Sequence, residues 1–216
     1  MRIRITSLLL ISGVLAFALL PAGVRADAGP VPAVVLPAAS AMIWDNHPVD
    51  GVGNASLKDA LFVGRRTDVK PPRLERSWLS FRLPELPAGT KLRSATLRLR
   101  LTDKLGSVSG AVTLYHSVSD NRTRWDGNNY TYENITYKTT GQTVATPETP
   151  KGQWIGIDVT ALIRSDYGTD TGVRVSSFRL QNDTLTSAGG SYAVFAFGSR
   201  GASAPQLVIA TGTADP

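Results

Sequence analysis

Alternation of apolar and polar residues is the feature that most constrains how this chain can fold. It is clearest in two segments, Ser77–Leu83 and Ser94–Leu101. Each segment places its leucines on one face of a strand, because successive side chains of a strand point to opposite sides. The opposite faces carry Trp78, Arg82, Arg98 and Arg100. We therefore expect a sheet with one buried face and an exterior that bears an aromatic ring and arginines.

Short segments of this kind, divided by Gly, Pro, Asn and Asp, continue from about Ser40 to Gly212. Their number and spacing are typical of an all-β sandwich or barrel. Only Asp158–Ser165 adds about one helical turn, and no internal repeat divides the chain, so we expect a single folded domain. The expected strands are Ala41–Trp44, Ala60–Val63, Ser77–Leu83, Ser94–Leu101, Ala111–Val118, Thr131–Tyr137, Gln153–Val159, Val173–Gln181, Ser191–Gly198 and Gln206–Ala210.

The first 26 residues have the pattern of a secretory signal peptide. Two early arginines precede an apolar run, and small residues follow at plausible cleavage spacings. The run is too short and wrongly flanked for a membrane span. Residues 27–40 are rich in Pro and Ala and are interpreted as a linker, which leaves 41–212 for the sandwich. The protein is therefore expected to be secreted and extracellular, without a membrane span.

The net charge does not indicate a nucleic-acid partner. Cleavage after residue 26 removes three arginines and no acid, so Lys+Arg falls from 23 to 20 against 17 Asp+Glu and the net charge falls from +6 to +3. No basic run or recognition motif accompanies it. The chain has no cysteine and only two histidines, so no transition-metal ligand set is expected.

Four stretches resemble, in order, the motifs of the DNRLRE domain, also classified as carbohydrate-binding module family 96. They are "SWLSFRLPELPAGTKLRSATLRLRL" (77–101), "WDGNNYTYENITY" (125–137), "WIGIDVTALIRS" (154–165) and "FAFGSRGASAPQLVI" (195–209). The resemblance covers roughly Ser40 to Ala210. It implies a jelly-roll-type antiparallel β-sandwich of the kind found in secreted bacterial proteins, often beside polysaccharide-degrading enzymes. It also implies polysaccharide as the partner, since some members bind acidic polysaccharide such as alginate.

Candidate sugar contacts come from two parts of the sequence. Aromatic rings stack on sugar C–H groups, and arginine grips carboxylate in a bidentate manner. The first candidate is a cationic strip on the outer strand faces, and it requires the two strands to be near neighbours in one sheet. It comprises Trp78, Arg82, Arg98 and Arg100. The alternative is an ordinary solvated face. Trp154 is expected to pack inside the sandwich.

The second candidate is the polar loop Ser119–Tyr137, since function often lies in loops on a rigid scaffold. Its recognition residues would be Arg122, Arg124, Trp125, Tyr130 and Tyr132. The alternative is a plain connection between strands.

A structural calcium ion is the expected cofactor, since many sandwich binding modules hold Ca²⁺ with side-chain and backbone oxygens. The stretch "WDNHPVDGVGNASLKD" (44–59) offers oxygen ligands in one Gly-punctuated loop. The candidate ligands are Asp45, Asp50, Asn54 and Asp59. The alternative is that these residues only form turns.

No catalytic constellation stands out in the sequence. His116 is in register with apolar residues and is interpreted as a hydrogen-bonded histidine lining the sandwich, while His47 lies in a turn-like stretch. There is no G-x-S-x-G elbow and no H-E-x-x-H motif. We expect a secreted, non-catalytic polysaccharide-binding module. The alternatives are a structural or adhesive surface module without sugar affinity, and a small polysaccharide lyase or hydrolase.

Overall fold

The structure is a computed structural model, and it describes residues 32–36, 39–45, 54–56, 60–68, 70, 72–117, 137–168, 174–185 and 190–213. In 39–45 and 54–56 the description covers the backbone. Over these described ranges no helix has both the length and the apolar character needed to cross a membrane.

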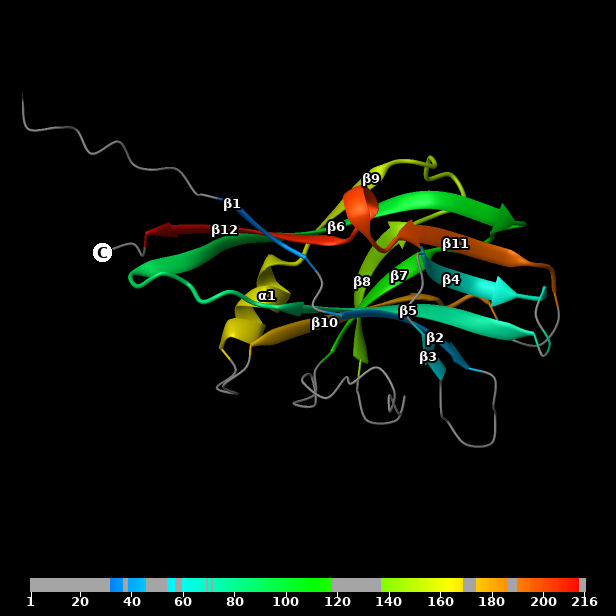
Figure 1. The fold of residues 1–216 in the computed structure, drawn as a ribbon, viewed down its shortest axis with the longest axis horizontal. Coiled ribbons are helices and arrows are strands. Elements are labelled where there is room, and N and C mark those ends of the chain that lie inside the picture. Colours follow the sequence, from blue (N-terminus) through cyan, green and yellow to red (C-terminus); the bar gives the residue numbers. More distant parts are fainter. Residues whose placement is uncertain are drawn as a thin grey trace, which may run out of the picture.

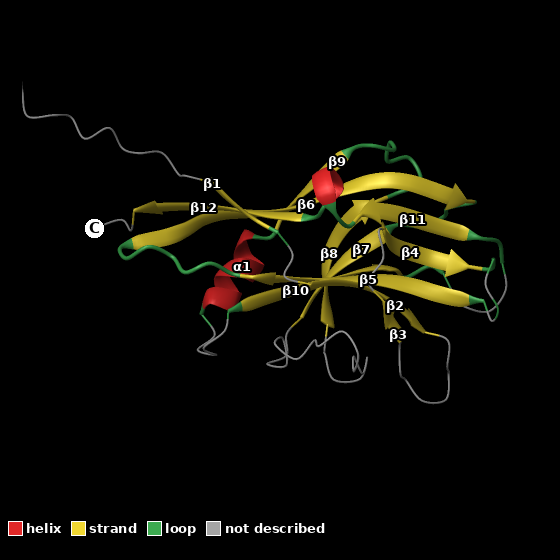
Figure 2. Ribbon diagram, in the orientation of Figure 1, coloured by secondary structure: helices red, strands yellow, loops and turns green. Residues whose placement is uncertain are grey.

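Twelve strands, one α-helix and a short 3-10 helix make up the described part of the chain (Figures 1 and 2). The strands are β1 (Pro32–Val35), β2 (Ala39–Asp45), β3 (Asn54–Ser56), β4 (Ala60–Arg66), β5 (Arg73–Arg82), β6 (Thr90–Gly106), β7 (Val112–Ser117), β8 (Tyr137–Ala145), β9 (Trp154–Asp158), β10 (Val175–Asn182), β11 (Ala193–Gly198) and β12 (Gln206–Thr213). The helices are α1 (Thr160–Tyr167) and η3 (Gly201–Ser203).

All the strands join one curled, antiparallel sheet that folds into two layers, as the all-β jelly-roll-like prediction requires. One layer contains β1, β12, β6, β11 and β9, and the other contains β2, β3, β5, β10, β7 and β8 (Figure 1). Strand β4 pairs with β11 and with the start of β5, so it links the layers.

Strand β6 organises the first layer because it is long enough to pair with three others. Its residues Thr96–Arg98 pair with both β12 and β9, so these two strands lie on opposite edges of β6. Further along, β6 pairs with β11. The outward side chains of β12, β6 and β9 therefore form one continuous surface.

The core lies between the layers and is built from the inward faces of the alternating strands. On β6 the residues Leu97, Leu99 and Leu101 are fully buried. Phe81 and Phe178, from β5 and β10, meet edge to face with ring centroids 6.2 Å apart. The burial of this apolar surface is the main term favouring the fold.

His116 is a buried, hydrogen-bonded side chain, as predicted. Its Nε2 lies 2.9 Å from Asp166 Oδ2, and both residues are buried. The pair attaches α1 to β7, beside the Phe178 ring at 5.3 Å. Ile163 is buried on the same helix.

Strands also occur where a linker or no strand was expected. Pro32–Val35 lies within the predicted linker 27–40, yet it forms β1 and pairs with β12 at Val34↔Val208. The structure thus gives these four residues a strand within the stretch that was expected to be a linker. Proline is tolerated at the start of an edge strand, because that position needs no ladder N–H on its outer side.

Strand β8 was missed because it is polar and half exposed. Of the expected strand Thr131–Tyr137, only Tyr137 is described, and it begins β8.

Candidate functional site

The outward side of β12, β6 and β9 brings together an aromatic ring, two guanidinium groups and an amide. The register places Gln206 of β12 beside Arg98 of β6, and Arg100 beside Trp154 of β9. All four side chains are partly exposed. We call this surface the outer face and define it by Arg98, Arg100, Trp154, Gly156 and Gln206.

Arg98 links the three strands of the outer face. Its guanidinium carbon lies 4.9 Å from the centre of the Trp154 ring. Its Nη1 donates a hydrogen bond to Gln206 Oε1 at 3.1 Å. The cation and the ring therefore lie against each other, with the amide holding one edge of the guanidinium. Such a cation–π contact stabilises an exposed site by about 0.5–1 kcal/mol.

Arg100 is held by the ends of neighbouring segments. Its Nε donates to the carbonyl oxygen of Gly152 at 3.3 Å, and its Nη1 donates to Ser203 Oγ at 3.2 Å. Ser203 belongs to η3, which leads from β11 into β12. The side chain is thus anchored at both sides of β6, which limits the entropy it loses when it binds a ligand.

The positive charges of Arg98 and Arg100 are not neutralised by a carboxylate within the described part of the chain. Their partners are an amide oxygen, a carbonyl oxygen and a hydroxyl. Asp158, further along the same side of β9, instead accepts hydrogen bonds from Thr160 N and Oγ1 at 2.9 and 2.6 Å. These bonds hold the pKa of Asp158 below its usual value. The outer face can therefore offer two guanidinium groups to an anion.

Gly156 leaves the middle of the outer face without a protruding side chain. It pairs with Arg98 between Trp154 and Asp158, and it is exposed. A Cβ at this position would meet only Thr96 Cγ2, at 3.4 Å. The absence of a side chain here leaves the Trp154 ring and the Arg98 guanidinium accessible from the side.

The prediction that Arg98 and Arg100 point out of the sandwich is confirmed by their partial exposure, while the prediction for Trp78 is wrong. Trp78 is only 1% exposed. Both faces of β5 are buried from Ser77 to Phe81. Alternation separates the two faces of a strand, but it does not tell whether the second face is covered. Trp78 is a packing residue rather than a surface ring.

Arg82 is exposed, but it does not join the other arginines. Strands β11 and β4 stand between β6 and β5 in the sheet order. The single strip that required neighbouring strands is therefore not formed, and its prediction is corrected to the outer face. Trp154, which was expected inside, supplies the ring instead. Alternation already pointed to this, since Ile155 and Ile157 pack on the core side of β9.

The loop candidates lie outside the described residues, and their role stays a prediction. They are Arg122, Arg124, Trp125, Tyr130 and Tyr132.

Of the predicted calcium ligands, the structure describes only the backbone of Asp45 and Asn54. Strands β2 and β3 pair at Trp44↔Asn54, so Asp45 and Asn54 lie at the same end of this ladder. The side chains of these two residues, and Asp50 and Asp59 entirely, lie outside the description. Among the described residues there is no group of three or more His, Cys, Asp or Glu placed to hold a metal ion.

A second arginine–aromatic cluster lies on the other layer and was not expected. The Arg179 guanidinium of β10 lies 4.8 Å from the Tyr115 ring centre and 4.6 Å from that of Tyr137. An acid accompanies it, because Tyr115 donates its hydroxyl hydrogen to Asp183 Oδ2 at 2.8 Å. Burial and Asp183 together raise the pKa of Tyr115. The carboxylate makes this cluster less suited to an anionic ligand than the outer face.

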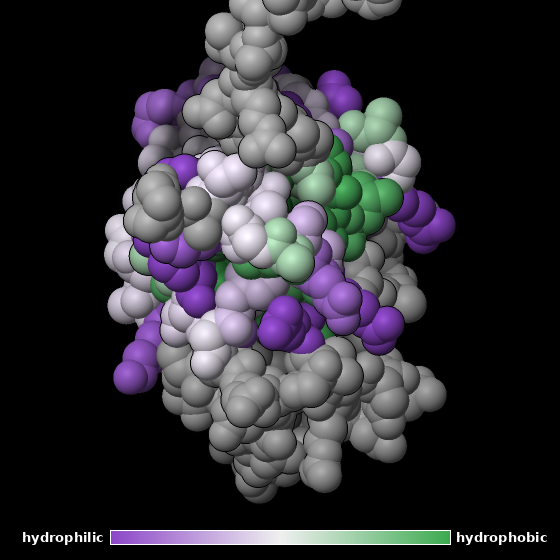
Figure 3. All heavy atoms as spheres, turned by 90° about the vertical axis from the view of Figure 1, so that its left-hand side faces the viewer, coloured by the Kyte–Doolittle hydropathy of each residue, from purple (hydrophilic) through white to green (hydrophobic). Residues whose placement is uncertain are grey.

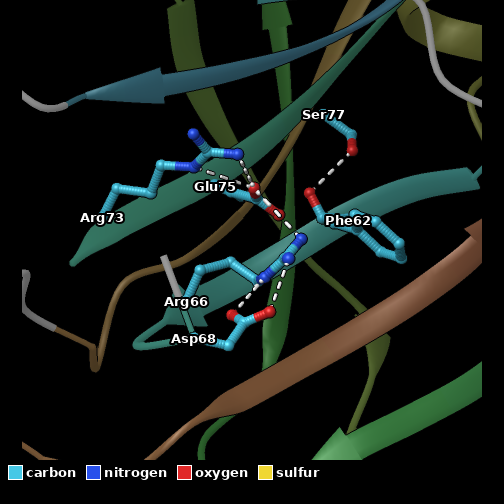
Figure 4. Close-up of polar contacts among 6 residues, drawn as sticks. All are labelled: Phe62, Arg66, Asp68, Arg73, Glu75 and Ser77. Carbon is cyan, nitrogen blue, oxygen red and sulfur yellow. Dashed lines mark hydrogen bonds and ion pairs between the residues drawn. The ribbon is translucent and has the colours of Figure 1, made fainter. Parts of the chain in front are cut away.

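A third charged cluster, at the β4–β5 hairpin, is a structural network (Figure 4). The buried Glu75 Oε1 accepts hydrogen bonds from Arg73 at 3.1 and 3.0 Å and lies 3.6 Å from Arg66 Nη1. Arg66 also donates to both oxygens of Asp68, at 2.6 and 2.7 Å. Burial raises the pKa of Glu75, against the opposing effect of the two arginines. Two acids and two bases balance here, so no net charge is available to a ligand.

The fold and the outer face define a class of protein: a jelly-roll-like β-sandwich with an arginine–tryptophan surface on one sheet. The model of carbohydrate-binding module family 96 matches residues 53–211 of the chain. The protein belongs to this family, which accords with the resemblance of its motifs. A search of the curated proteins found no significant match.

Proposed function

We propose that the protein is a secreted, non-catalytic module that binds acidic polysaccharide, such as alginate, on the outer face. The observation that carries this proposal is the pair of guanidinium groups, Arg98 and Arg100, flanking the partly exposed Trp154 ring without a neutralising carboxylate among the described residues. Family membership supports carbohydrate as the ligand class. The guanidinium pair supports an acidic one, because arginine matches carboxylate geometry.

The outer face has the chemistry of a polysaccharide contact. The Trp154 ring offers an apolar surface for sugar C–H groups, and the arginines offer N–H donors to uronate carboxylates and to hydroxyls. The surface is open rather than enclosed, because the neighbouring Gly156 has no side chain. An open surface suits internal residues of a long chain, and the charge term makes binding sensitive to salt.

The pattern of the first 26 residues supports secretion, and the burial of His116 supports a non-catalytic role. A histidine that acts as the base of a lyase must be accessible, whereas the His116 ring is bonded to Asp166 inside the domain. The second histidine, His47, lies outside the described residues.

Affinity electrophoresis of the purified protein in gels containing alginate, pectin, xylan or chitin tests the proposal. The wild type should be retarded by alginate and pectin and released by added salt. Arg98→Gln and Arg100→Gln should each weaken binding to the acidic polymers by about tenfold, the effect of losing a charge-assisted hydrogen bond. Lys138→Gln is the matched control, since Lys138 is an exposed cation on β8 in the other layer.

Three results would overturn the proposal. Equal retardation of the wild type and both arginine variants would exclude the outer face as the binding surface. The appearance of unsaturated products or new reducing ends in the polymer solution would show catalysis. A wild type retarded by no glycan would favour the structural or adhesive alternative.

A further inference from the structure

A cavity of about 500 Å³ lies at the end of the sandwich where β6 begins, before the stretch of β6 that pairs with β9. It is formed between the start of β6, the segment that precedes it and the last turns of α1. Its apolar lining comes from Leu86, Leu92 and Tyr167, and its cationic lining comes from Lys91, Arg93 and Arg164. Thr90 completes the described lining. None of these residues is acidic, so the cavity is both cationic and partly apolar.

The apolar wall of the cavity is fixed by the Tyr167 ring. The Tyr167 hydroxyl donates a hydrogen bond to the carbonyl oxygen of Pro84 at 2.9 Å. The Arg174 guanidinium also contacts this ring, with its carbon 5.8 Å from the ring centre. Burial raises the pKa of Tyr167, so the ring stays neutral near pH 7. A neutral, fixed ring is a suitable surface for the apolar side of a sugar.

The cationic wall retains hydrogen-bonding capacity for an anion. Arg164 Nη2 donates to the carbonyl oxygen of Leu92 at 3.4 Å, a neutral partner. Within the described residues neither Arg164 nor Lys91 forms an ion pair with a carboxylate. Arg164 also stands in the last turn of α1, where a cation interacts favourably with the helix dipole. The side chain is therefore positioned by the helix while its charge faces the cavity.

Figure 3 looks onto this end of the molecule, where a hydrophobic area and several hydrophilic residues lie side by side. We propose that this end cavity binds the terminal residue of an acidic polysaccharide, with Arg164 and Lys91 taking the carboxylate and Tyr167 stacking on the sugar. This inference rests on the proposed function for its ligand class, but it uses a different surface. The cavity would recognise chain ends, whereas the outer face would bind chain interiors.

Isothermal titration with oligogalacturonates of short and long chain length separates the two surfaces. End binding gives one site per ligand molecule whatever its length, whereas interior binding gives more sites on longer chains. Arg164→Gln should weaken the length-independent event by about tenfold, because it removes a charge-assisted contact. Lys91→Gln, an exposed substitution at the start of β6, provides a second cavity variant. Lys138→Gln serves again as the charge-matched control.

The outcomes are distinct for the two proposals. If both cavity variants bind the short oligogalacturonate as tightly as the wild type, the end cavity is excluded. If Arg98→Gln alone removes that binding, the short ligand uses the outer face and the end cavity is again excluded. Sodium sulfate and free galacturonate are compared as competitors of the short ligand. If sulfate displaces it at the same concentration as galacturonate does, the cavity is a simple anion site and not a sugar site. If the wild type binds the short oligogalacturonate but is not retarded by any acidic polymer, the outer face is excluded and the end cavity stands.

Discussion

Arg98 of β6 stacks on Trp154 of β9, with 4.9 Å between the guanidinium carbon and the ring centre. The two residues are far apart in the sequence and meet because β6 and β9 pair antiparallel. The contact fixes the ring on the surface and aligns the guanidinium with it. A stacked pair of this kind is organised before the ligand arrives, which reduces the entropic cost of binding.

Replacing Trp154 should affect acidic and neutral glycans alike, in contrast to the arginine substitutions. Trp154→Ala removes the stacking surface and the partner of Arg98 together, so we expect a loss of about tenfold in affinity for every glycan that the wild type binds. Trp154→Phe should retain part of the affinity, because it keeps a ring. Affinity electrophoresis measures both. A selective loss for acidic polymers alone would show that Trp154 acts only through Arg98.

Filling the gap at Gly156 should block binding without damaging the fold. An added Cβ would have Thr96 Cγ2 as its only close neighbour, and the backbone has no positive φ, so the strand accepts a Cβ here and Gly156→Val suits its β conformation. The new side chain would stand between Trp154 and Asp158. We expect unchanged or slightly higher thermal stability and a loss of polysaccharide binding. Thr143→Val, at an exposed position of β8, is the control. Normal binding by Gly156→Val would mean that the glycan lies elsewhere.

The contrast between Trp78 and Trp154 shows how much of the site the sequence could predict. Alternation predicted the inward leucines of β6 and the outward Arg98 and Arg100, because these depend only on the strand itself. It placed Trp78 outside, since the covering of the second face of β5 is a tertiary property. The pairing of Arg98 with Trp154 depends on which distant strands are neighbours. Strand content was predictable from local pattern, whereas the composition of the outer face required the topology.

Breaking the His116–Asp166 pair should destabilise the domain strongly. His116→Ala leaves the Asp166 carboxyl buried without its ring-nitrogen partner, at a cost of about 3 kcal/mol or more. The double variant His116→Leu/Asp166→Leu should recover part of this loss, since it removes the buried carboxyl together with its ring-nitrogen partner. Urea unfolding monitored by tryptophan fluorescence gives the free energies. A double variant no more stable than His116→Ala would contradict the pair's assigned role.

Glu75 should make stability fall as pH rises through the mildly acidic range. Burial raises its folded-state pKa above the ordinary value of 4.5, while Arg66 and Arg73 oppose the shift. The folded protein therefore holds this proton more tightly than the unfolded chain does. The stability gained from this tighter proton binding by Glu75 is complete below pH 4.5 and is lost as pH rises through the folded-state pKa.

Glu75→Gln should flatten that part of the stability profile relative to the wild type. Chemical unfolding at a series of pH values measures the difference between the two proteins. Glu85→Gln, which changes an exposed acid, is the control. A wild-type profile that rises through this range, with the rise absent in Glu75→Gln, would show that the arginines outweigh burial and lower the pKa.

Gly64, the one glycine of the linking strand β4, should not tolerate a side chain. Its φ is +146°, and an added Cβ would approach the Ala193 carbonyl oxygen closely, well inside contact distance. Since Gly64 pairs with Val194 of β11 and Glu75 of β5, this clash falls where the two layers are joined. Gly141→Ala is the matched control, because its φ is +72° and nothing lies within 4 Å of the added Cβ. The control should lose about 1 kcal/mol from backbone strain alone, and Gly64→Ala should lose clearly more. Equal losses in thermal or urea unfolding would mean that the β4–β11 junction relaxes freely and does not hold the layers together.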